Sequence, residues 1–165
     1  MEPQPPAALI LQTLDRHLSG PAEVRLMGGA SMTLAYGMAR STEDVDLLLT
    51  QPEAEFLAEH RDLGDALEAT NTELEPLGLY LTHIWGPEQE ILGPTWKERC
   101  RPVSVANLRH LTVTTLGPLD LLTSKLCRAD DLDLADIDWL IRHEALDADE
   151  VRAALRTAVV PEDFR

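Results

Sequence analysis

The 165-residue chain has few aromatic residues, two cysteines and two lysines. Aromatic residues make up 4% of the chain, so we expect a core built mainly from Leu, Val, Ile, Ala and Met. Cys100 and Cys127 have neither the spacing of a metal motif nor the number needed for a disulfide framework. We therefore expect buried or idle thiols. The scarcity of lysine makes the positions of Lys97 and Lys125 worth examining.

Long apolar runs are also absent. No run approaches the roughly 20 residues that a membrane-spanning helix needs, so we expect no membrane association. The first residues, MEPQPPAA, contain an acidic residue and prolines where a signal peptide has basic residues, which predicts a cytoplasmic location. With 165 residues, of which 44% are hydrophobic, the chain is typical of one folded domain spanning residues 1–165.

Acidic residues outnumber basic ones by 29 to 14, which gives a net charge of −15. Such a surface repels phosphate backbones and argues against broad nucleic-acid binding by a basic face. It leaves open a nucleotide that is held locally by a metal ion. One region is locally basic, and it either contacts a nucleotide or an acidic acceptor, or else pairs with a protein partner. Its residues are Trp96, Lys97, Arg99, Arg101, Arg109 and His110.

Hydrophobic periodicity and turn residues predict a mixture of helices and strands. Helices are expected over Ala7–Leu18, Ser31–Met38, Glu53–Pro76 with a break near Leu63-Gly64, Pro118–Arg128, Leu132–His143 and Asp147–Val159, the last capped by Asp147. Strands are expected over Glu23–Met27, Asp44–Leu49, Leu79–Trp85, Pro102–Ala106 and Leu108–Thr115, the last two forming a hairpin around Asn107. This order predicts an α/β (α+β) fold, in which a small mixed sheet (about residues 20–115) is flanked by helices and followed by a helical C-terminal part (about residues 117–160).

Two aspartates in the second predicted strand are the sharpest chemical feature of the sequence. Side chains two residues apart in a strand point to the same face, so Asp44 and Asp46 face together while Val45 turns to the core. Two adjacent carboxylates repel each other unless a cation lies between them. Mg²⁺ or Mn²⁺ would relieve the repulsion, because hard cations prefer carboxylate oxygens. The alternative is an acidic strand end without a metal.

A glycine pair lies between the first strand and the following helix. Gly28 and Gly29 would let backbone N–H groups approach a phosphate closely, and Ser31 would add a hydroxyl. Taken alone, the pair is a weak signal, and a plain tight turn is the favoured interpretation. A glycine turn and an Asp-x-Asp strand, in this order and separated by one helix, are much more specific together.

The stretch GGASMTLAYGMARSTEDVDLLL resembles the nucleotidyltransferase superfamily. The pattern of that superfamily is a Gly-Gly or Gly-Ser turn, a helix, and then Asp-x-Asp or Asp-x-Glu among apolar residues. The spacing of Arg40, Thr42, Asp44 and Asp46 is similar to a minimal branch of uncharacterised and AbiEii-like toxin members. The later segment SKLCRADDLDLADIDWLI is also similar to those proteins, with a lysine, an arginine and then Asp-x-x-Asp-Ile opening a helix.

The resemblance implies a nucleotidyltransferase-type fold, an NTP substrate and Mg²⁺ or Mn²⁺ as cofactor. The implied site comprises Asp44 and Asp46 as metal ligands, these two with Lys125 as catalytic residues, and Gly28, Gly29, Ser31, Arg40 and Thr42 as nucleotide-binding residues. Arg40 either pairs with Asp44 or Asp46 or contacts the triphosphate.

Lys125 lies in an otherwise apolar helical segment. Either it reaches to water along the surface, or, as the resemblance implies, it contacts nucleotide phosphates. Asp133 and Asp136 share a helix face, and they either cap the helix and pair with Arg128 or belong to the site.

A third carboxylate is not evident. Active members of the superfamily usually have an Asp or Glu on a later strand, where this chain has Thr82 and His83. His83 is a candidate metal ligand or base, although a strand histidine is more often structural, and Glu88 and Glu90 follow the strand.

The leading hypothesis is a Mg²⁺-dependent enzyme that transfers a nucleoside monophosphate from an NTP to a hydroxyl of RNA, protein or a small molecule. A role in a toxin–antitoxin pair is part of this hypothesis. The alternative is a catalytically degenerate protein of the same fold that binds a nucleotide or a protein partner.

Overall fold

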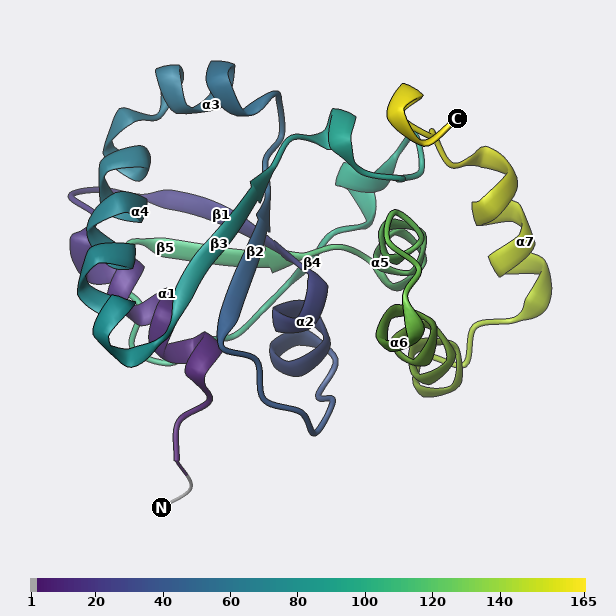
Figure 1. Ribbon diagram of the computed structural model, residues 1–165, viewed down its shortest axis with the longest axis horizontal. Helices are drawn as coiled ribbons and strands as arrows, with labels where there is room; N and C mark the ends of the chain where they lie inside the picture. The colour runs from purple at the N-terminus through teal and green to yellow at the C-terminus, as the bar shows by residue number, and fades with distance from the viewer. Residues whose placement is uncertain (1–2) are drawn as a thin grey trace. The chain divides into compact units, whose positions relative to one another are not determined.

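The computed structural model describes residues 3–165, apart from the side chains of Thr82 and His83. The chain divides into two compact units (Figure 1). The sheet unit contains the residues up to Gly86 together with Pro102–Thr115. The helical unit contains Pro87–Arg101 and Leu116–Arg165.

The sheet unit contains most of the strands. Its elements in chain order are α1 (Pro6–His17), β1 (Ala22–Met27), α2 (Gly28–Ala30) with a π-helical turn (Ser31–Ala35), β2 (Asp44–Leu48), α3 (Glu53–Glu59), α4 (Arg61–Leu74) with a 3-10 turn (Glu75–Leu77), β3 (Tyr80–Trp85) and β5 (Leu111–Thr115). The two-residue strand β4 (Arg101–Pro102) lies at the boundary of the units.

The five strands form one mixed sheet with the order β3-β2-β1-β5-β4. Strand β2 runs antiparallel to β1 and parallel to β3, while β5 runs parallel to β1. Helices α3 and α4 form the crossover connection between the parallel strands β2 and β3. The predicted α/β class, a small mixed sheet flanked by helices, is thus confirmed.

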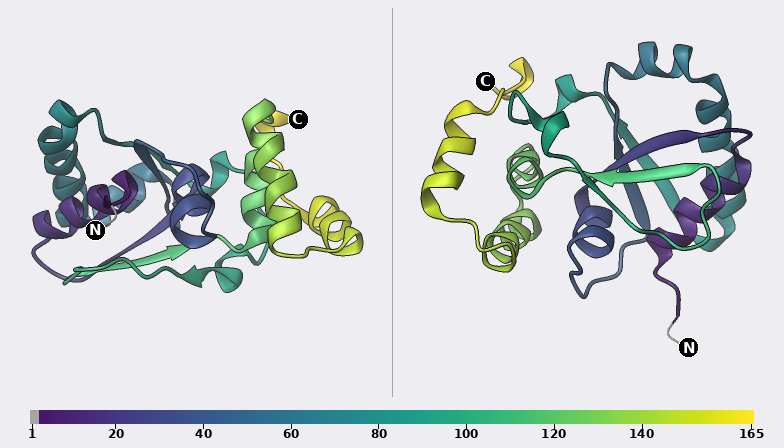
Figure 2. Two further views of the ribbon diagram at one scale, coloured as in Figure 1. Left: turned by 90° about the horizontal axis from the view of Figure 1, so that it is seen from below. Right: turned by 180° about the vertical axis from the view of Figure 1, so that it is seen from behind.

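Helices α1 and α4 pack against each other and cover one face of the sheet (Figures 1 and 2). The apolar stripe predicted for α1 is buried, and Ile10, Leu11 and Leu14 are completely inaccessible. Alternate residues of β2, beginning with Val45, point into the same core. The opposite face of β2 therefore carries Asp44 and Asp46.

The helical crossover breaks at His60 and not at Leu63-Gly64, where the sequence predicted the break. His60 has φ −125° and ψ 59°, which lie outside the helical region. Its ring Nδ1 and backbone N–H both contact the carbonyl oxygen of Phe56, which ends α3. Gly64 N–H donates to the His60 carbonyl, so α4 continues through the glycine.

The predicted hairpin of two longer strands is reduced to β4 and β5. The turn lies at Asn107 as predicted, with a left-handed φ of 63°. The backbone N–H groups of Arg109 and His110, however, donate to the carboxylate of Asp15 on α1. These two groups bind a side chain and not a neighbouring strand, and β5 begins at Leu111, whose N–H also donates to Asp15.

The helical unit begins with a 3-10 turn (Pro87–Gln89), a second 3-10 turn (Trp96–Arg99) and α5 (Pro118–Lys125). It continues with α6 (Asp131–His143), α7 (Ala148–Thr157) and a 3-10 turn (Glu162–Phe164). Asp147 caps α7 as predicted, and it forms a capping box with Glu150. Among the described residues, no helix combines the length and apolar character needed to cross a bilayer.

Candidate functional site

The two carboxylates of β2 are placed as the sequence predicted. Val45 is completely buried in the core, while Asp44 is exposed and Asp46 is half-buried on the other face. Asp46 pairs in register with Met27, the last residue of β1. This pairing brings the second carboxylate beside the glycine turn that follows β1.

Gly28 makes the closest approach to the carboxylate pair. Its φ of 64° lies in the left-handed region, which favours glycine. A Cβ atom at this position would lie 2.7 Å from Asp46 Oδ2, closer than real Cβ atoms come to another atom. Both the backbone conformation and the space beside Asp46 therefore require glycine at position 28.

The helix after the turn begins earlier than predicted. It starts at Gly28 itself and becomes π-helical from Ser31, where Tyr36 N–H donates to the Ser31 carbonyl. It ends at Ala35 and not at Met38, and Gly37 follows with φ 76°. Single π-helical turns occur frequently at functional sites.

The loop before β2 completes the same group of side chains. Thr42 Oγ1 donates to Asp44 Oδ1 over 2.9 Å. A Cβ on Gly29 would lie 3.4 Å from Thr42 Oγ1 and 3.6 Å from Arg40 Nη2. Asp46 thus lies beside Gly28, Arg40 and Thr42 lie beside Gly29, and Thr42 binds Asp44, so these predicted site residues form one group.

Ser31 does not present its hydroxyl to this group. The residue is completely buried, and its Oγ lies 2.8 Å from Thr115 Oγ1 on β5. This hydrogen bond fixes the helix to the sheet. The phosphate contact predicted for Ser31 stays a prediction, and the burial of the residue argues for a structural role.

His83 on β3 stands where active members of the superfamily usually have the third carboxylate. It pairs in register with Asp46, beside a bulge in the β2–β3 ladder. The side chain of His83 lies outside the described residues. Glu90 is buried in the helical unit and accepts a hydrogen bond from Cys127, and Glu88 is exposed. Among the described residues, no three His, Cys, Asp or Glu side chains are grouped so as to hold a metal ion.

Lys125 belongs to a second cluster, in the helical unit. Its side chain is 5% exposed, and Nζ lies 2.8 Å from Asp136 Oδ2 and 3.7 Å from Asp133 Oδ1. The sequence-based alternative in which Lys125 reaches to water is therefore wrong, because two buried carboxylates satisfy its charge. The predicted phosphate contact stays a prediction.

Asp133 also pairs with Arg128, as one of the sequence-based alternatives held. Arg128 Nε and Nη2 donate to the two carboxylate oxygens over 2.8 and 3.1 Å. The helix cap is different from the predicted one, since Asp130 accepts the backbone N–H of Asp133. This hydrogen bond holds the pKa of the Asp130 carboxyl below its usual value.

Two arginines of the locally basic region, Arg99 and Arg101, form structural ion pairs that sequence reasoning missed. Arg99 binds the buried carboxylate of Asp120 through Nε and Nη2, over 2.8 and 2.9 Å. Arg101 pairs with Glu144 over 2.6 Å. The partners lie far along the chain, so no local spacing could have revealed them.

Cys127 is half-buried, and its thiol donates a hydrogen bond to Glu90 Oε2. Burial and the neighbouring Glu90 carboxylate raise its pKa to about 12. Cys100 is half-buried and forms no disulfide, and its thiol donates to the Trp96 carbonyl oxygen. That both thiols are idle stays a prediction.

A glycine turn held against an Asp-x-Asp strand, within a small mixed sheet flanked by helices, defines a protein of the nucleotidyltransferase class. A family model matches residues 9–163, and its family is described as nucleotidyltransferase of unknown function (DUF6036). The chain belongs to this family. No curated protein and no solved structure matched the chain.

Proposed function

We propose that the protein is a Mg²⁺-dependent nucleotidyltransferase that transfers a nucleoside monophosphate from an NTP to a hydroxyl acceptor. The observation that supports this most directly is the closeness of Asp46 to the glycine turn, where a Cβ on Gly28 would meet Asp46 Oδ2 at 2.7 Å. A carboxylate and the backbone of a half-buried glycine turn that opens a helix thus lie side by side. This is the arrangement that a metal-bound phosphate group requires.

The donor set suits a hard divalent cation. Asp44 and Asp46 supply carboxylate oxygens on one face of β2, and Asp44 is exposed. Bound Mg²⁺ or Mn²⁺ would offset the charge of the carboxylates and of the phosphates. The cradle beside Asp46, which any side chain at position 28 would fill, fits a small ion and a phosphate oxygen.

The chain's own residues would position the reactants. Backbone N–H groups at Gly28 and Gly29 would hold phosphate oxygens, and Arg40, whose Nη2 lies beside Gly29, would offset triphosphate charge. Thr42 would keep the Asp44 carboxylate in place through its 2.9 Å hydrogen bond. Lys125, Asp133 and Asp136, which belong to the helical unit, remain candidates for the site on the ground of the sequence resemblance.

The reaction itself needs little covalent chemistry from the protein. The acceptor hydroxyl oxygen forms a bond to the α-phosphorus, and the bond from that phosphorus to the bridging oxygen breaks. Pyrophosphate leaves, and the hydroxyl proton passes to water. Positioning and charge compensation then supply most of the acceleration.

A second function is favoured by a specific observation. Because the described residues hold two carboxylates at the site and no third, the protein is alternatively a nucleotide-binding or partner-binding member that has lost catalysis. A place in a toxin–antitoxin pair is compatible with either function.

The test of nucleotide binding is thermal unfolding with Mg²⁺ and each of the four common NTPs. We expect Mg²⁺ plus an NTP to raise the Tm, and Asp44→Asn with Asp46→Asn to abolish the rise. The matched control is Asp65→Asn, which removes an exposed carboxylate of the same unit and should leave the rise intact. No rise with any NTP in the wild-type protein would contradict a nucleotide site.

The test of catalysis is separate. NTP labelled on the α-phosphate should leave a labelled acceptor and release pyrophosphate, and the doubly substituted protein should do neither. A clear Mg²⁺- and NTP-dependent rise in Tm without any turnover would favour the non-catalytic function.

A further inference from the structure

Thr115, the last residue of β5, contacts the chain on both sides of the glycine turn. It pairs in register with Leu26 of β1, which precedes the turn. Its Oγ1 lies 2.8 Å from the Oγ of Ser31, which follows the turn. One residue of a neighbouring strand therefore holds both the entry to the turn at Gly28 and the exit from it.

The two hydroxyl groups of this contact are shielded from water. Ser31 is completely inaccessible, and Thr115 is 1% exposed. A buried hydroxyl is costly unless it is hydrogen-bonded, so each of the two stabilises the other, whichever one donates. The bond therefore resists displacement of Ser31 from β5.

The helix that follows the turn is too short to keep its conformation by itself. It has three α-helical residues, Gly28–Ala30, and five π-helical residues, Ser31–Ala35. Isolated helices shorter than about 12–15 residues are marginal in water, so tertiary contacts must hold this one. Ser31 lies where the two parts meet, since its N–H donates to the Gly28 carbonyl and its carbonyl accepts from Tyr36. A contact at Ser31 therefore acts on both parts of the helix.

The carboxylate strand lies on the other side of the turn. Met27 pairs in register with Asp46, and a Cβ on Gly28 would lie 2.7 Å from Asp46 Oδ2. Because the space is this small, a displacement of the helix would change the distance between the turn and the carboxylate. The bond between Ser31 and Thr115 opposes such a displacement.

We propose that Thr115 is a positioning residue of the nucleotide site. It acts through Ser31 and keeps Gly28 and Gly29 beside Asp46, where a metal-bound phosphate would lie. This inference rests on the proposed function, to which it adds a residue of β5. It also gives the Ser31 hydroxyl the role of an anchor in place of a phosphate contact.

The first experiment is isothermal titration of the full chain with Mg²⁺ and each of the four common NTPs. Valine has the shape of threonine without the hydroxyl, so Thr115→Val should weaken NTP binding by roughly tenfold. Thr115→Ser keeps the hydroxyl and should restore most of the affinity.

A second set of variants separates positioning from stability. Ser31→Ala combined with Thr115→Val removes both hydroxyls and leaves neither unpaired, so the Tm without ligand should stay close to that of the wild type. The affinity for the NTP should nevertheless remain roughly tenfold weaker. Thr70→Val is the matched control, because Thr70 is also completely buried and its Oγ1 donates to the Ala66 carbonyl on α4 over 2.6 Å. This control should lower the Tm and leave the affinity unchanged.

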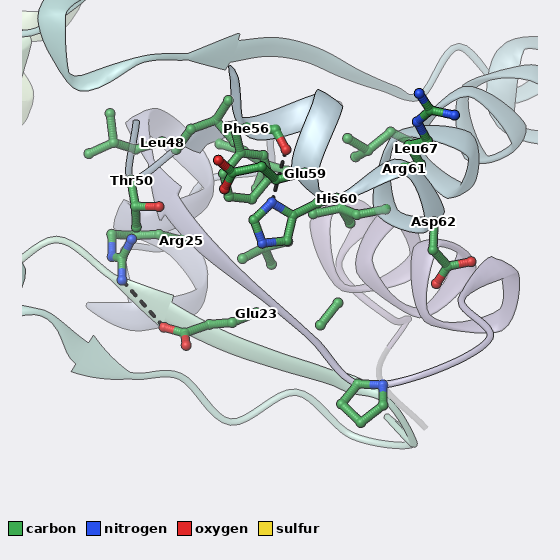
Figure 3. Close-up of a pocket in the computed structure, with 16 residues that line it drawn as sticks. Glu23, Arg25, Leu48, Thr50, Phe56, Glu59, His60, Arg61, Asp62 and Leu67 are labelled. Atoms are coloured by element: carbon green, nitrogen blue, oxygen red, sulfur yellow. Dashed lines mark hydrogen bonds and ion pairs between the residues drawn. The ribbon is translucent and has the colours of Figure 1, made fainter. Parts of the chain in front are cut away.

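Hydrogen exchange tests the contact without any nucleotide. Thr115→Val should speed the exchange of the Ser31 N–H, which donates to the Gly28 carbonyl, by about tenfold. The reference is the Leu49 N–H, which donates to the Trp85 carbonyl over 2.8 Å. Leu49 lines a cavity of about 510 Å³ between the start of β1 and the end of β2, away from the turn (Figure 3). Its exchange should stay as in the wild type, because the substitution acts locally.

The two experiments fail in different ways. If the wild-type protein binds no NTP, the proposed function fails, and the exchange of the Ser31 N–H alone decides whether Thr115 holds the turn. The inference is overturned by unchanged Ser31 exchange in Thr115→Val, or by wild-type affinity in Thr115→Val or in the double variant. An equal loss of affinity in Thr70→Val, or no recovery in Thr115→Ser, would also overturn it.

Discussion

Lys125 Nζ lies 2.8 Å from Asp136 Oδ2 in the helical unit, and their side chains are 5% and 2% exposed. Removing one partner of a buried ion pair leaves an uncompensated charge, which costs about 3–5 kcal/mol. We therefore expect Lys125→Met to lower the free energy of unfolding by about that amount. Urea denaturation measures the loss.

The matched variant combines Lys125→Met with Asp136→Leu. Replacing both charges by apolar side chains should restore most of the lost stability, since buried pairs exchange for apolar contacts at little net cost. If the double variant is stable yet loses the Mg²⁺- and NTP-dependent rise in Tm, Lys125 has a role at the nucleotide beyond stability. Retention of that rise would assign the pair a structural role alone.

Gly28→Ala should disable the nucleotide response. An alanine at this position would be strained by the left-handed φ of 64°, and its Cβ would also collide with Asp46 Oδ2. Gly37→Ala is the control, because Gly37 has φ 76° but open space around it. Strain at a left-handed position costs about 1–3 kcal/mol, so both variants should lose stability and Gly28→Ala should lose more.

A double-mutant cycle measures the part of this stability loss that comes from the collision with Asp46. Asp46→Ala removes the carboxylate that the new methyl group would meet, so it should reduce the stability cost of Gly28→Ala. Simple additivity of the two changes in chemical denaturation would show that the closeness of Gly28 to Asp46 has no energetic consequence.

Asp15 should make stability depend on pH in the acid range. Burial raises the pKa of its carboxyl, but hydrogen bonds from the backbone N–H groups of His110, Arg109 and Leu111 outweigh burial and hold the pKa below its usual value. The carboxylate therefore stabilises the fold above an ordinary pKa of about 4. This stabilisation is lost as the pH falls through the lowered pKa of the folded state.

Asp15→Asn should lower the unfolding free energy at neutral pH by about 2–4 kcal/mol, because an amide cannot accept all of these hydrogen bonds. Urea denaturation at several pH values should show the difference from the wild type shrinking below pH ~4. Asp65→Asn, on the exposed side of α4, should show little effect at either pH. A constant difference across the range would contradict this account.

Arg99→Lys should destabilise the helical unit by about 1–3 kcal/mol, because lysine cannot reproduce a two-point contact with the buried Asp120. Hydrogen exchange should report faster exchange of the Gly93 N–H, which donates to the same carboxylate. Arg142→Lys, in an exposed pair with Asp138, is the control and should change stability very little. Equal effects of both substitutions would contradict the role of Asp120.

Local sequence patterns predicted the elements that depend on local physics. The apolar stripe of α1, the burial of Val45 between two outward aspartates and the Asp147 cap all follow from periodicity and capping chemistry. Where a distant group competes for the backbone, these patterns mislead. The strand predicted over Leu108–Thr115 is shortened because Asp15, about 95 residues earlier, accepts its first N–H groups.

The sequence alone determined which residue types share a face, since strand alternation acts over a few residues. It did not determine the partners of buried charges, because Lys125 with Asp136 and Arg99 with Asp120 pair through tertiary packing that brings separate segments together. Tertiary structure alone also decided that Ser31 bonds to Thr115 and that the space beside Gly28 is shaped by Asp46. The reason is physical: a buried polar group takes whichever partner the packed chain places within hydrogen-bond distance, wherever that partner lies in the sequence.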